Sequence, residues 1–104
     1  MAWIYLTLAG LFEIGWPIGL KMSQESDSRS MGIILAIVCM SISGFLLWLA
    51  QRQIPIGTSY AVWTGIGAAG TFLVGVFFYD DPSSFGRYLG IILIIAGVAT
   101  LKLA

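Results

Sequence analysis

The 104-residue sequence has no histidine and a single cysteine, and this scarcity excludes much of the usual chemistry of enzymes and metal sites. Cys39 cannot form a disulfide within the chain, and metal-ligand spacings are absent. Glycine-rich phosphate loops, Ser/His/Asp arrangements and basic nucleic-acid patches are also missing. We therefore expect no enzymatic activity, no metal, no cofactor and no nucleic-acid partner.

Charged residues are scarce too, at 10% of the chain, whereas 59% of the residues are hydrophobic. A soluble core of this size cannot absorb so much apolar surface. A spanning helix needs about 20 mostly apolar residues, because it crosses roughly 30 Å of hydrocarbon at about 1.5 Å per residue. The chain has room for four spans and little else, so we expect an all-α membrane protein with one four-helix domain over residues 1–104.

Four apolar runs have the required length, and short polar segments with turn-forming residues separate them. The expected spans are residues 2–22, 31–50, 56–79 and 85–104. Glu13 is the only charged residue that lies away from the ends of these spans.

Glu13 lies about 18 Å along the first helix, near the middle of the bilayer. An ionised side chain there costs at least about 3 kcal/mol on insertion scales. Such a carboxylate tends to hold a proton unless a cation pairs with it. If proton and cation exclude each other, a proton gradient can drive the cation the other way. The alternative is a structural glutamate that only forms hydrogen bonds.

Three neighbours of Glu13 fall on adjoining parts of one helical stripe: Gly10, Trp16 and Pro17. Gly10 is expected to leave space beside the carboxylate, and Trp16 to supply a wall or a cation–π surface. Pro17 lacks the N–H that would bond the carbonyl of residue 13, so a bend is expected there. The alternatives are plain packing for Trp16 and a tolerated kink for Pro17.

The third span carries a second candidate face, because Tyr60, Trp63 and Gly67 follow i, i+3, i+7 spacing. A hydroxyl and two aromatic rings suit the orientation of a carboxylate and the binding of a cation, although an aromatic packing stripe would have the same spacing. Gly65 and Gly67 are candidate hinge residues or sites of close helix contact.

Two further features concern contacts between helices. In the second span, Ser41 and Ser43 are candidates to hydrogen-bond Glu13, although membrane serines often bond their own helix. In the fourth span, Gly90 and Gly97 are seven residues apart on one face, which suits a helix–helix interface.

The distribution of Lys and Arg gives almost no preferred orientation. Four spans place Arg52, Lys102 and the amino terminus on one side, and Lys21, Arg29 and Arg87 on the other. Insertion in both orientations is one reading, and a fixed orientation set by weak signals is the other. A second, inverted copy would supply the half that a single thin chain lacks for alternating access.

Three of these features together resemble the small multidrug resistance family, and the resemblance covers nearly the whole chain. It rests on Glu13, on PIGTSYAVWTGIGAAG at residues 55–70 and on GIILIIAGV at residues 90–98. The resemblance implies a proton-coupled exporter of cations that works as an antiparallel homodimer of oppositely inserted copies. It also implies that the two Glu13 side chains form a shared proton and substrate site lined by Tyr60 and Trp63, with residues 90–98 at the dimer contact.

Within that family, the sequence is similar to the branch that exports guanidinium, on the grounds of Gly10, Glu13, Trp16, YAVWTGIGA and Ser43, the last matching that branch's hydrogen-bonding serine. A planar guanidinium can make a bidentate pair with a carboxylate. We therefore expect a guanidinium exporter in a bacterial inner membrane, with protons, a small organic cation and the lipid bilayer as partners. The alternatives are an exporter of quaternary ammonium or polyaromatic cations and, more distantly, a passive channel or structural subunit.

Overall fold

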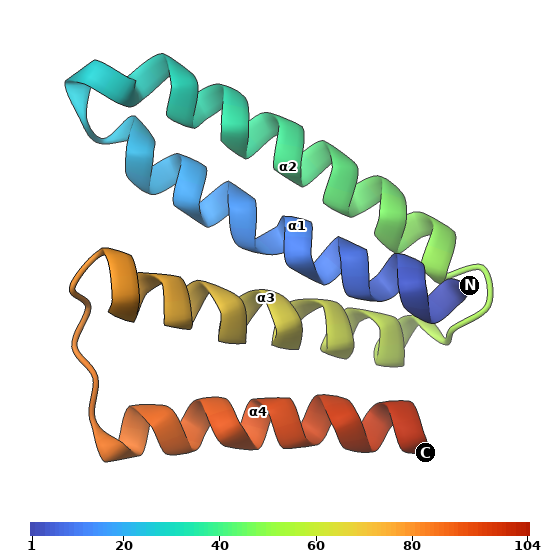
Figure 1. The fold of residues 1–104 in the computed structure, drawn as a ribbon. Helices are drawn as coiled ribbons and strands as arrows, with labels where there is room; N and C mark the ends of the chain where they lie inside the picture. The colour runs from blue at the N-terminus through green and yellow to red at the C-terminus, as the bar shows by residue number, and fades with distance from the viewer.

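The computed structural model describes residues 1–104 and contains four long helices joined by short connections (Figure 1). The helices are α1 (Ala2–Ser23), α2 (Arg29–Ala50), α3 (Ile56–Phe78) and α4 (Phe85–Leu103). A short 3-10 helix, η1 (Ser26–Ser28), lies in the first connection. All four long helices have the length and apolar composition to cross a membrane, which confirms the expected all-helical class with four candidate spans.

The helices form a flat layer in the spatial order α2, α1, α3, α4 (Figure 1). The layer measures 44 × 34 × 16 Å, so it is little thicker than one helix with its side chains. The backbone of α1 lies close to both α2 and α3, whereas that of α4 lies close to α3 alone, and α4 has no buried residue. One copy of the chain therefore leaves large apolar surfaces uncovered.

Small residues let α1 and α2 pack backbone to backbone near the first connection. A Cβ atom added to Gly19 would lie 2.6 Å from both the Gly32 oxygen and the Ala36 nitrogen. One turn earlier on α1, Gly15 leaves the space that the Cys39 thiol occupies. Close backbone approach of this kind is a common basis of helix association in membranes. The two helices therefore form a tight hairpin.

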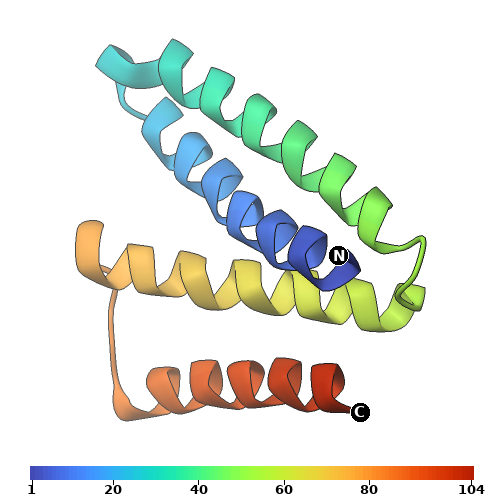
Figure 2. The ribbon, with the colours of Figure 1, turned by 45° about the vertical axis from the view of Figure 1, so that its right-hand side comes forward.

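The main apolar core lies at one end of the layer, beside the second connection. Its buried residues are Ala2, Leu6, Ala50, Ile54 and Val62. Helices α1 and α3 are closest at this end and diverge toward Ser23 and Phe78 (Figure 2). The structure is thus packed at one end and open between α1 and α3 at the other.

The packed end carries the amino terminus, the second connection and the carboxyl terminus (Figure 1). Two cations lie over tryptophan rings here: Arg52 is 4.5 Å from the Trp48 ring centre, and Lys102 is 5.9 Å from that of Trp3. Tryptophan and long cationic side chains favour the membrane–water interface. This end therefore carries side chains typical of a membrane–water interface, and Glu13 lies away from it, at the middle of α1.

Candidate functional site

The carboxylate of Glu13 is oriented by a neighbour on its own helix. Trp16 lies one turn further along α1, and its Nε1–H donates a hydrogen bond to Glu13 Oε1. Residues at i and i+3 share a helix face, so this contact follows from the local geometry of α1. Both side chains are partly exposed. The Trp16 donor fixes one carboxylate oxygen and leaves the rest of the acceptor capacity of Glu13 for a ligand.

Helix α3 approaches Glu13 through a glycine. Gly67 is buried, and a Cβ atom at this position would collide with Cγ of Glu13. Two more contacts of the same kind flank it, because Gly70 receives the side chain of Ile14 and Gly10 receives that of Ile66. Bare backbone on one helix thus meets a side chain on the other at three successive levels.

An open hollow of about 330 Å³ lies beside the Glu13 carboxylate, between α1 and α3. Its lining residues are Glu13, Trp16, Pro17, Thr64, Gly67, Ala68 and Thr71. The Thr64 hydroxyl donates to the Tyr60 carbonyl at 2.7 Å, so its oxygen keeps a lone pair for another donor. The hollow therefore combines one carboxylate with two hydroxyl oxygens, a set that suits a small cation with several N–H donors.

Ser43 lies outside this hollow and links three helices. Its hydroxyl donates to the Ala9 carbonyl on α1 at 2.6 Å and accepts the Trp63 Nε1–H from α3 at 2.8 Å. The expected hydrogen bond from Ser43 to Glu13 is therefore not formed. The hydroxyl instead reaches the carbonyl one turn before Glu13, to which the Glu13 amide bonds in a regular helix. Ser41 bonds only the Ile37 carbonyl of its own helix.

The two aromatic residues expected on the site face are adjacent to each other. The rings of Tyr60 and Trp63 have centres 5.6 Å apart at an angle of 52°. Tyr60 is 56% exposed, and neither residue lines the hollow beside Glu13. Gly10 differs from expectation as well, because Ile66 fills the space that it was expected to leave beside the carboxylate. One chain thus brings together Glu13, Trp16, Pro17 and Gly67, with the aromatic pair nearer the packed end.

The remaining candidate residues fall into two groups. Pro17 lies inside α1, which continues to Ser23, and Gly65 lies inside the equally continuous α3. Gly65 packs against Ile94 and Val98 of α4. Gly90 and Gly97, by contrast, have no atom within 4 Å of the place that an added Cβ atom would occupy. The hinge and bend expectations stay predictions, as does the role of Gly90 and Gly97 in a dimer contact.

Thr64 and Thr71 line the hollow on α3 and were not predicted from the sequence. Together with Gly67 and Ala68 they form a stripe with i, i+3, i+4, i+7 spacing that faces α1. The sequence contains this polar stripe within an apolar helix. Tyr60 and Trp63 are more distinctive residues of the same helix, and they led to the prediction of a different face.

Comparison with known proteins agrees with this arrangement. The family description "Small Multidrug Resistance protein" matches residues 1–94. A protein of Yersinia pseudotuberculosis named "Guanidinium exporter" is 49% identical over 104 residues, which cover 100% of this chain and 99% of the relative. Proteins of the same name from Salmonella typhimurium and Citrobacter freundii are each 43% identical, over 100% of this chain and 98% of theirs. A full-length match of this kind, together with four spanning helices, shows that the chain belongs to the small multidrug resistance family of membrane transporters.

Proposed function

We propose that this protein exports guanidinium and small guanidinyl cations from bacteria in exchange for protons, and that Glu13 binds the proton and the cation in turn. The observation that carries the proposal is the Glu13 carboxylate, fixed by Trp16 and open to a hollow at the middle of a spanning helix. Relatives named "Guanidinium exporter", at 43–49% identity over the full length, support the choice of substrate.

The chemistry of the hollow favours guanidinium over a quaternary ammonium ion. Guanidinium carries only N–H donors, which match the carboxylate of Glu13 and the hydroxyl oxygens of Thr64 and Thr71. A quaternary ammonium ion has no donors and would leave these oxygens without partners, at a free-energy cost. Export of quaternary ammonium or polyaromatic cations is the alternative that the same assay tests.

The exchange of protons for cations follows from the position of Glu13 within the membrane. An ionised carboxylate at this depth is costly, so the site is occupied either by a proton or by a cation. A cation that arrives from the cytoplasm displaces the proton, and a proton that arrives from outside displaces the cation. If the empty, ionised site does not reorient across the membrane, the two movements are coupled.

An antiparallel homodimer in the inner membrane would complete the site. The flat layer, with no buried residue on α4, leaves one copy with an open hollow and no second wall. An inverted copy would add a second Glu13 and a second gate, as alternating access requires. The near-equal division of Lys and Arg between the two ends is compatible with insertion in both orientations.

The test is transport in liposomes loaded with a pH-sensitive dye. Adding guanidinium should drive proton movement with wild-type protein, and Glu13→Gln should abolish it. Glu25→Gln, a matched change in the first connection, should transport normally. No proton movement with guanidinium but movement with benzalkonium would shift the substrate to the alternative class. Flux without proton movement would contradict coupled exchange.

Dual insertion has its own test. In a Cys39→Ala background, Ser26→Cys and Gln53→Cys place a thiol at opposite ends of the layer. An impermeant maleimide added to sealed cells should label part of each population. Complete labelling of one variant and none of the other would refute insertion in both orientations.

A further inference from the structure

The open end of the layer holds a second hollow, of about 190 Å³, between the ends of α1 and α3. Its lining residues are Pro17, Ile18, Lys21, Thr71, Val74, Gly75, Tyr79 and Asp81. Pro17 and Thr71 also line the hollow beside Glu13, so the two spaces adjoin. A groove therefore runs from the mid-membrane carboxylate to the end of the layer that carries the first and third connections.

The chain folds an acid back over this outer hollow. Asp80 has a left-handed backbone with φ of 57°, a conformation that aspartate tolerates better than most residues. This turn lets the Asp81 N–H donate to the Gly75 carbonyl at 3.0 Å. The Asp81 carboxylate then lies over Gly75, where a Cβ atom would collide with Oδ2. The position of this carboxylate thus depends on the bare backbone of Gly75.

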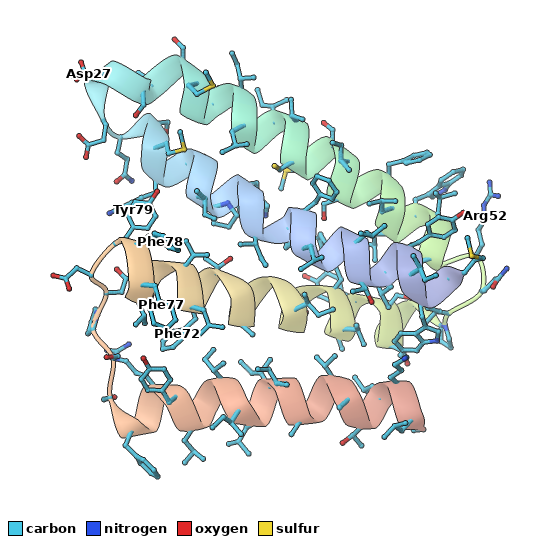
Figure 3. The ribbon with its side chains drawn as sticks, in the orientation of Figure 1. Asp27, Arg52, Phe72, Phe77, Phe78 and Tyr79 are labelled. Atoms are coloured by element: carbon cyan, nitrogen blue, oxygen red, sulfur yellow. The ribbon has the colours of Figure 1, made fainter.

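Two hydroxyl-bearing side chains and one cation complete the hollow. Tyr79 lies at the end of α3 on the side that faces α1 (Figure 3), and Thr71 marks the junction with the inner hollow. Lys21 belongs to the last turn of α1 and lies across from α3. Oxygen acceptors thus lead outward from Glu13 to the hollow that Asp81 lines, with one positive charge on the opposite wall.

We propose that this outer hollow is a second cation station, in which Asp81 attracts the transported cation on its way to or from Glu13; the proposal rests on the proposed export function. The acceptors suit the same guanidinium-type donors as the inner site. Lys21 offsets the charge of Asp81, so the station holds the cation weakly, and a transit site must release its ion as readily as it binds it. In an antiparallel dimer, each face of the membrane would carry one such station.

A labelling experiment tests the station without relying on transport. Thr71→Cys is introduced with Cys39→Ala and Glu13→Gln, so that the probe thiol lies in the groove and the inner charge is removed. Its reaction rate is measured with two methanethiosulfonates, one with a trimethylammonium tail and one neutral. Asp81 should favour the cationic reagent. The ratio of the reaction rate with the cationic reagent to that with the neutral reagent should therefore fall about threefold in Asp81→Asn, as expected for an exposed charge.

Three further variants test whether the preference for the cationic reagent comes from the charge of Asp81 in its observed position. Asp80→Asn removes the neighbouring charge and should leave the ratio unchanged. Gly75→Ala keeps the Asp81 charge but displaces it, so the ratio should fall as it does in Asp81→Asn. Lys21→Gln should raise the ratio. Equal ratios in Asp81→Asn and Asp80→Asn would overturn the proposal, whatever the transport assay shows.

Transport then places the station in the export cycle. With Glu13 restored and no added cysteine, Asp81→Asn should raise the KM for guanidinium about threefold relative to Asp80→Asn, with the maximal rate nearly kept. If the cysteine-labelled protein prefers the cationic reagent but the wild-type protein does not move guanidinium, the export function is rejected while the cation station stands. An unchanged KM in Asp81→Asn would reject the role of the station in transport.

Discussion

The side chain of Glu13 rests against the bare backbone of Gly67, where a Cβ atom would collide with Cγ of Glu13. The contact fixes how deeply α1 and α3 approach each other and leaves the carboxylate beside an open hollow instead of under a side chain. Gly67 therefore acts on the site through the position of Glu13.

Gly67→Ala should reduce guanidinium transport about tenfold, because the added methyl group must displace the Glu13 side chain or separate the helices. Gly57→Ala is the matched control on the same helix, since a Cβ atom at Gly57 has no neighbour within 4 Å. Initial transport rates in liposomes, at equal amounts of inserted protein, measure the difference. Equal rates in the two variants would contradict the role assigned to Gly67.

Trp16→Phe removes the Nε1–H donor to Glu13 while it keeps an aromatic ring beside the hollow. A hydrogen bond to a charged group contributes about 1.5–3 kcal/mol, so the KM for guanidinium should rise roughly tenfold or more. Trp48→Phe, an exposed change on α2, is the control. A KM equal to that of the control would show that the hydrogen bond does not help to bind the cation.

Ser43→Ala should destabilise the protein by about 1–3 kcal/mol, because it leaves the Trp63 N–H without its acceptor and frees the Ala9 carbonyl from α2. Ser41→Ala removes the same hydroxyl two residues earlier, where it bonds only its own helix, and should change stability little. Unfolding of the purified protein in denaturing detergent measures both. Similar losses in the two variants would contradict a link between three helices.

Local features of the site could be predicted from the sequence, whereas contacts between helices could not. Trp16 lies one turn from Glu13, so helical periodicity alone places the two side chains on one face. The contact of Glu13 with Gly67 depends on the register of α1 against α3, which packing at Gly10 and Gly70 sets. The hydrogen-bond partner of Ser43 depends on the rotation of α2 about its axis. This rotation directs the Ser43 hydroxyl to the Ala9 carbonyl instead of Glu13.

The ends of the helices and the turns between them also divide into features that could be predicted from the sequence and features that could not. Helix α2 begins at Arg29, before the apolar run that predicted a span from residue 31, because a polar turn can continue a helix beyond the hydrocarbon. The number of candidate spanning helices follows from apolar length alone, and the four long helices of the structure confirm it. The left-handed turn at Asp80 and the return of Asp81 to Gly75 had no signal that periodicity could detect.

Competition between protons and guanidinium should make the KM depend on pH. Each tenfold rise in proton concentration should raise the KM up to tenfold, roughly, once protons occupy most Glu13 sites, and the KM should level off at high pH. Transport measured with equal pH on both sides, from about pH 6 to about pH 9, tests this. A KM that does not change over that range would show that protons and guanidinium do not compete for the same site.

The proposed dimer contact can be tested with three glycines of α4. Gly86, Gly90 and Gly97 all lack a neighbour within 4 Å of an added Cβ atom, so a Cβ atom at each is free of contacts within one chain. If the Gly90/Gly97 face packs on a second copy, Gly97→Leu should weaken the dimer by about 1–3 kcal/mol, as overpacking does in other tight contacts, whereas Gly86→Leu should not. Cross-linking in liposomes at decreasing protein density measures the dissociation. Equal dissociation of the two variants would place the dimer contact elsewhere.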